Sequence, residues 1–122
     1  MTHPVLSSLI AAHKAADTAV KQATDKFWAV ERRAALTRSE RQQRFIDLEQ
    51  AHQQLELCHA HRDRIVQCIA ECLIEMGHSF KPVANGISDI NHDEPGLGTI
   101  TVERIGTAWM LHFLPVMAGA AA

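Results

Sequence analysis

Cysteines and histidines between residues 58 and 72 are the side chains that could ligate a metal. Cys58 and His61 are three residues apart, and Cys68 and Cys72 are four apart, spacings at which two side chains of one helix can chelate. The two pairs lie about 15 Å apart along a straight helix, so they cannot share one tetrahedral zinc ion. We therefore expect no metal and no cofactor, and we interpret the thiols as small apolar residues in a helix-packing surface.

The same segment contains the residue types of a nucleophilic site. Cys58, a histidine at position 59 or 61, and Asp63 could supply a Cys–His–acid set. All of them fall within two turns of one predicted helix, where side chains diverge, and no oxyanion donors are evident beside them. We expect no catalytic residues and no enzymatic activity.

An acidic stretch follows near residue 90. Asp89, Asn91 and Asp93 match the first three ligand positions of an EF-hand loop, but Glu94 replaces the glycine at the sixth position and Ile100 the glutamate at the twelfth. The two positions that do not match are the ones that form the turn and supply the bidentate ligand. We interpret the stretch as a solvated acidic loop and as a secondary acidic surface made of Asp89, Asp93 and Glu94.

The strongest concentration of charge lies between residues 31 and 44. This segment contains five arginines and only two glutamates, in a chain of net charge −2. Arginine forms bidentate contacts with carboxylates and phosphates, and a tryptophan can stack on a partner. We predict one binding surface here, which we call the arginine surface. It consists of Trp28, Arg32, Arg33, Arg38, Arg41 and Arg44.

Long helices must position these side chains, because residues 5–76 contain neither glycine nor proline. Apolar residues recur at alternating spacings of three and four from Leu6 to Ala34, which predicts a first helix over 4–36 with a coiled-coil-like stripe. Thr37 and Glu40 match a capping box, so we predict a turn at 36–39 and a second helix over 38–76 that ends at Gly77.

The last part of the chain changes character. Turn residues predict a loop over 81–98, and the alternating segments 99–104 and 107–114 predict a β-hairpin. With Ile105 and Gly106 as its turn, Val102 would face Trp109. Residues 116–122 are expected to be a flexible tail, and the uncharged segment 105–122 to be a buried strand and tail rather than a membrane anchor.

The predicted fold is therefore mainly α (α+β), with 1–122 as a single domain of 122 residues. A long antiparallel two-helix hairpin is followed by a loop and a two-stranded β-hairpin, packed at the end opposite the helix–helix turn. Residues 65–76 are apolar on nearly every side. A helical hairpin cannot cover so wide a stripe. Unless the β-hairpin covers all of it, the remainder must pack against another chain, and we expect a homodimer.

These features favour a binding protein over an enzyme. We expect a small adaptor or inhibitor that binds another protein through a rigid helical surface. An odd number of cysteines and the absence of a signal-peptide pattern favour the cytoplasm, and no membrane partner is expected. Two alternatives stay open: a nucleic-acid-binding accessory protein that uses the arginine-rich tip, and a metal- or redox-responsive sensor.

Overall fold

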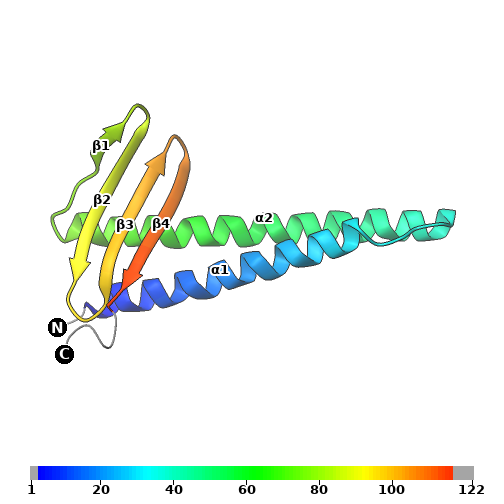
Figure 1. The fold of residues 1–122 in the computed structure, drawn as a ribbon, viewed down its shortest axis with the longest axis horizontal. Coiled ribbons are helices and arrows are strands. Elements are labelled where there is room, and N and C mark those ends of the chain that lie inside the picture. Colours follow the sequence, from blue (N-terminus) through cyan, green and yellow to red (C-terminus); the bar gives the residue numbers. More distant parts are fainter. Residues whose placement is uncertain (1–2, 117–122) are drawn as a thin grey trace. The chain divides into compact units, whose positions relative to one another are not determined.

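The computed structural model describes residues 3–116 and shows two helices followed by an antiparallel sheet (Figure 1). The helices are α1 (Pro4–Glu31) and α2 (Arg38–Glu75). The strands are β1 (Lys81–Ala84), β2 (Ile87–Glu94), β3 (Gly98–Ile105) and β4 (Ala108–Pro115), and they lie in the sheet in chain order. The α+β class and the helical hairpin are confirmed, whereas the predicted two-stranded β part is wrong because the sheet has four strands.

The described residues divide into two compact units. Residues 14–62 form one, the hairpin unit, and residues 3–13 together with 63–116 form the other, the sheet unit. Both long helices therefore contribute to both units.

The junction of the two helices differs from the prediction. α1 ends at Glu31 rather than at residue 36, and residues 32–37 form the connection. Thr37 is the cap of α2, as its sequence indicated: its Oγ1 accepts a hydrogen bond of 3.1 Å from the Glu40 N–H. At the other end of α2, Gly77 has a φ of 104°, and the His78 N–H donates to the Leu73 carbonyl at 3.0 Å. This is a Schellman motif, and it confirms Gly77 as the helix stop.

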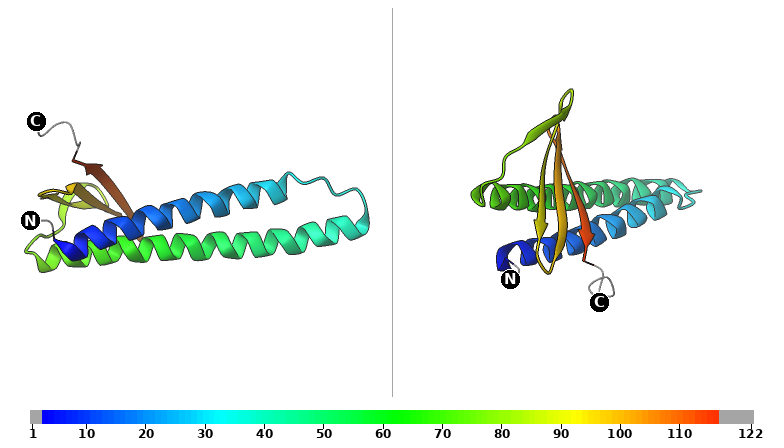
Figure 2. Two further views of the ribbon diagram at one scale, coloured as in Figure 1. Left: turned by 90° about the horizontal axis from the view of Figure 1, so that it is seen from below. Right: turned by 60° about the vertical axis from the view of Figure 1, so that its left-hand side comes forward.

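The hairpin unit has a core of small side chains. Its parts of α1 and α2 run antiparallel and side by side (Figures 1 and 2). The residues buried between them are Ala16, Val20, Ala23 and Ala51. Alanine removes little apolar area from water when it is buried, so hydrophobic burial contributes little to this unit.

The sheet unit has larger core residues. Leu6, Val66, Ile69, Leu73, Ile90, Ile100 and Val102 are its most deeply buried side chains, each less than 2% exposed. Most of the apolar part of α2 is therefore covered within one chain, whereas Ile74 is 48% exposed. The expectation of a dimer rested on that stripe being too wide to cover, and the four-stranded sheet removes this reason.

The prediction of a loop over 81–98 is wrong, because this segment contains β1 and β2. Asn85 and Gly86 are the two-residue turn of a hairpin that joins β1 to β2, with Gly86 at a φ of 77°. β2 was missed because it is mostly polar: Ile90, His92 and Glu94 lie on one face, and Asp89, Asn91 and Asp93 lie on the other.

The β3–β4 hairpin exists, but with a different register. Its turn is Gly106–Thr107, so Val102 pairs with Leu111, and Trp109 pairs with Arg104. The register is two residues away from the predicted one. A shift of two keeps each side chain on its predicted face, and for that reason the apolar face was predicted correctly.

Neither helix within residues 3–116 is long and apolar enough to cross a membrane. Apart from Val116, the predicted tail over 116–122 lies outside the described residues.

Candidate functional site

All six residues of the arginine surface lie in the hairpin unit, around the 32–37 connection. Three of the arginines are held by internal contacts. Arg33 forms an ion pair of 2.6 Å with Asp47, Arg41 donates to the Leu36 carbonyl at 3.1 Å, and Arg44 donates to the Arg33 carbonyl at 3.0 Å. The guanidinium groups of Arg41 and Arg44 satisfy carbonyls that follow the end of α1, so they stabilise the connection.

The hydrogen bond from Arg33, and a second one from Gln43, hold the pKa of the Asp47 carboxyl below its usual value of 3.8. Asp47 is thus ionised at neutral pH and neutralises part of the positive charge. Arg38 makes no ion pair or side-chain hydrogen bond within residues 3–116, and the Arg32 guanidinium lies 6.0 Å from the centre of the Trp28 ring. The charge available to a partner is therefore smaller than the sequence indicates.

Large apolar side chains accompany these arginines, and they were not predicted to belong to the surface. Leu36 is 83% exposed, Phe45 is 63% exposed and Ile46 is 47% exposed. Phe45 and Ile46 line a surface hollow of about 470 Å³ together with Arg38, Arg41 and Gln42. The sequence signal was their setting, because every other residue between 37 and 47 is polar.

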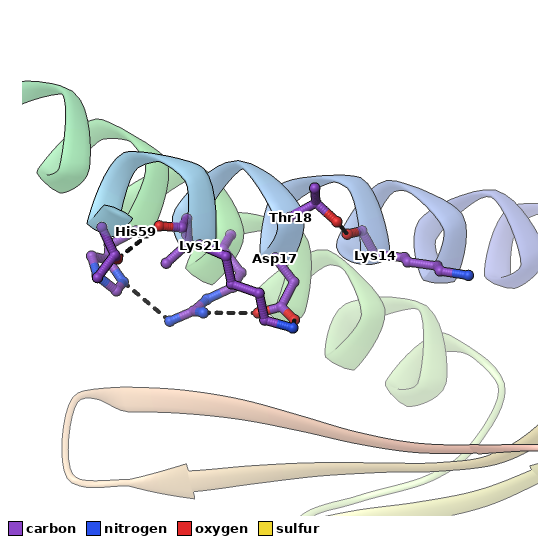
Figure 3. Close-up of polar contacts among 8 residues, drawn as sticks. Lys14, Asp17, Thr18, Lys21 and His59 are labelled. Carbon is purple, nitrogen blue, oxygen red and sulfur yellow. Dashed lines mark hydrogen bonds and ion pairs between the residues drawn. The ribbon is translucent and has the colours of Figure 1, made fainter. Parts of the chain in front are cut away.

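The first and last turns of the hairpin unit carry a polar cluster. The Arg62 guanidinium, 28% exposed, donates to Asp17 at 3.1 Å and contacts Nδ1 of His59 at 3.1 Å (Figure 3). Asp17 also forms an ion pair of 3.6 Å with Lys21, one turn along α1. The cluster holds α1 against α2 at a position where the packing stripe of α2 contains an arginine instead of an apolar residue.

A second cluster, in the sheet unit, was not predicted. Glu94 is only 5% exposed. Its Oε2 lies 2.6 Å from His92 Nε2, and its Oε1 accepts a hydrogen bond of 2.7 Å from the His3 N–H. His92 Nδ1 lies 2.9 Å from His78 Nε2. We call this the His–Glu cluster; it joins β2, the segment after α2 and the segment before α1.

Hydrogen bonding favours the ionised form of Glu94 in the His–Glu cluster. His92 is the first cause, and the His3 N–H the second, of a Glu94 pKa below its usual 4.5. With Glu94 ionised, His92 must donate from Nε2, so a neutral His92 accepts from His78 at Nδ1. The sequence signal was the spacing of His92 and Glu94, which places both on one face of a strand.

The acidic surface is therefore different from the predicted one. Asp89 and Asp93 lie on the outer face of β2, where Asp93 accepts a hydrogen bond from Thr99 at 2.6 Å. Glu94 lies on the opposite face and is buried, so it does not belong to an exposed surface.

Cys72 is buried, whereas Cys58 and Cys68 are half-buried. Burial, and then the charges of Glu75 and Glu94, raise the pKa of the Cys72 thiol above its usual 9.0. A protonated thiol is a poor nucleophile and a poor metal ligand. No group of three or more His, Cys, Asp or Glu residues among residues 3–116 is arranged to hold a metal ion.

Comparison of the chain with protein-family models, with curated proteins and with solved structures found no match. The function has to be argued from the two clusters and the surfaces described above.

Proposed function

We propose that this protein is a non-enzymatic interaction module, an adaptor or inhibitor, that binds another protein through the arginine surface and the adjoining apolar side chains. The observation that carries the proposal is the hollow lined by Phe45, Ile46, Arg38 and Arg41. Exposed aromatic and arginine side chains are the types enriched where proteins bind each other. Soluble proteins seldom expose several large apolar side chains together without a binding role.

The internal contacts support a protein partner over a nucleic acid. A phosphate backbone is bound by many free cations, whereas Arg33, Arg41 and Arg44 already donate to Asp47 or to backbone carbonyls. An apolar hollow beside a few arginines suits a protein segment that carries both apolar and acidic side chains. We propose a reducing compartment such as the cytoplasm, since Cys58, Cys68 and Cys72 are all free.

A homodimer remains part of the proposal, although the apolar part of α2 no longer supports it. The support now comes from the sheet, in which β4 pairs with only one neighbour among the described strands.

The test is affinity capture from host lysate followed by mass spectrometry. The variant Arg38→Glu/Phe45→Ser changes two exposed residues that make no structural hydrogen bond, so the fold should survive, as circular dichroism would show. The matched control is Arg64→Glu, an exposed arginine of the same helix in the sheet unit. We expect proteins captured by the wild type and the control to be lost, at least tenfold, from the variant.

Equal capture by all three proteins would contradict the proposal. Captured nucleic acid whose binding falls steeply with salt, and which the same variant loses, would instead favour the nucleic-acid alternative.

A further inference from the structure

The two edges of the sheet have unlike characters. β1 has four residues, contains Pro82, and pairs with β2 in an irregular register between Pro82 and Ala84. β4 has eight residues, and each of them pairs with one residue of β3 without a bulge. Proline, irregularity and short length are devices that block an edge strand from pairing further, and β4 lacks all three before Pro115.

The backbone of β4 has unused hydrogen-bonding groups. A two-residue turn makes Ile105 and Ala108 a hydrogen-bonded pair. Because such pairs alternate along an antiparallel ladder, the N–H and C=O groups of Trp109, Leu111 and Phe113 point away from β3. They form a regular row of donors and acceptors along an edge that no other described strand covers.

The side chains of β4 are also of the kind that allows an edge strand to pair with another strand. Residues 108–116 contain no Asp, Glu, Lys or Arg, and Met110, Leu114 and Val116 are 45%, 73% and 54% exposed. The one ionisable residue is His112, which contacts Glu103 of β3 at 2.8 Å. Long, uncharged, apolar edge strands are templates for pairing with another strand.

We propose that β4 pairs antiparallel with β4 of a second copy of this chain, around a two-fold axis at Leu111, to join two sheets into one. In this register every outward N–H faces an outward C=O, and Trp109 lies opposite Phe113 of the other copy. The inference rests on the homodimer within the proposed function, and it is independent of the arginine surface.

Charge favours a second copy over a foreign peptide as the occupant. Self-pairing brings no like charges together, because β4 has none, while the same edge gives a charged peptide no ion pair for recognition. The edge asymmetry also makes the assembly finite: with β1 blocked, two copies use both available edges and the complex closes as a dimer.

The first test is sedimentation velocity of the full chain over a range of concentrations. We expect the wild type to approach twice the chain mass of 13.5 kDa. Met110→Lys/Leu114→Lys places lysines on two exposed positions of β4 and should weaken the dimer at least tenfold. Val83→Lys/Ala84→Lys makes the same change on two exposed residues of β1 and should leave it intact.

Hydrogen exchange locates the interface without any substitution. Raising the wild-type concentration should slow exchange at Trp109, Leu111 and Phe113, but not in β1. A wild type that stays monomeric, a lysine variant of β4 that dimerises as well as the wild type, or a dimer without slowed exchange in β4 would each overturn the proposal. A monomeric wild type would also overturn the homodimer within the proposed function. None of these outcomes bears on capture through the arginine surface, so binding of a foreign protein is tested separately.

Discussion

Glu94 is the residue whose chemistry depends most on its surroundings. It is buried on the inner face of β2, yet it remains a carboxylate because the His92 side chain and the His3 N–H both bind it. A buried carboxylate without such partners would be costly. The His–Glu cluster therefore has a structural role: it ties residues before α1 and after α2 to the sheet.

The Glu94→Gln substitution tests this role. Since the pKa of Glu94 is lowered in the folded state, its stabilisation is complete at neutral pH and is lost as the pH falls through that lowered value. We expect the variant to have a lower Tm at pH 7, and a Tm that changes less between pH 6 and 3 than that of the wild type. Thermal melts at several pH values measure both effects.

Glu71→Gln is the matched control, because Glu71 is an exposed carboxylate of the same unit. It should leave the wild-type acid slope unchanged. An acid slope of wild-type size in the Glu94 variant would mean that other carboxylates dominate.

At the scale of elements, turns decide how the sheet is built. Three successive turns each contain a glycine with positive φ, at Gly86, Gly96 and Gly106. Gly98 is different, because it begins β3 directly opposite Pro115, where two backbones approach closely. With a φ of 146° and no room for a Cβ, Gly98 permits β3 and β4 to pair at this end of the hairpin.

Separate substitutions of Gly98 and Gly106 by alanine should distinguish the effect of close backbone approach from the effect of positive φ alone. In Gly98→Ala the new Cβ would overlap the Leu114 carbonyl, and we expect a loss of about 3 kcal/mol in the free energy of unfolding. In Gly106→Ala the Cβ meets nothing within 4 Å, so only backbone strain of about 1 kcal/mol is expected. Urea unfolding measures both; equal losses would contradict the close-approach explanation.

At the scale of the whole molecule, the two units differ in what stabilises them. The core of the hairpin unit is three alanines and a valine, supported by the contact of Arg62 with Asp17. The core of the sheet unit contains leucine, isoleucine and valine from helix and strand. Local opening costs less where fewer apolar contacts are lost, so we expect the hairpin unit, which carries the proposed binding surface, to open more easily.

Native-state hydrogen exchange should reveal this difference. We expect amides of residues 14–31 and 38–62 to exchange through openings of lower free energy than amides of Val66–Leu73, β2 and β3. The comparison is internal, so it needs no variant. Equal protection in the two units would show that the chain opens only as a whole.

Much of the local structure was predictable because it depends on neighbouring residues. The cap at Thr37 and the stop at Gly77 follow from side-chain and backbone chemistry within one turn, and the structure confirms both. The arginines were found for the same reason, because their concentration is visible without any fold. What they contact was not predictable: Arg33 meets Asp47, fourteen residues away, only when two helices lie side by side.

The sequence by itself determined that there are two helices, where α2 begins and ends, and which face of β3 and β4 is apolar. These features depend on periodicity and capping, which are local properties. Only the tertiary structure decided that β1 and β2 exist, since β2 is mostly polar and forms by pairing with β3. It also decided that Glu94 is buried and that Phe45 and Ile46 are exposed. Burial depends on what packs against a residue, and residue types alone do not contain that information.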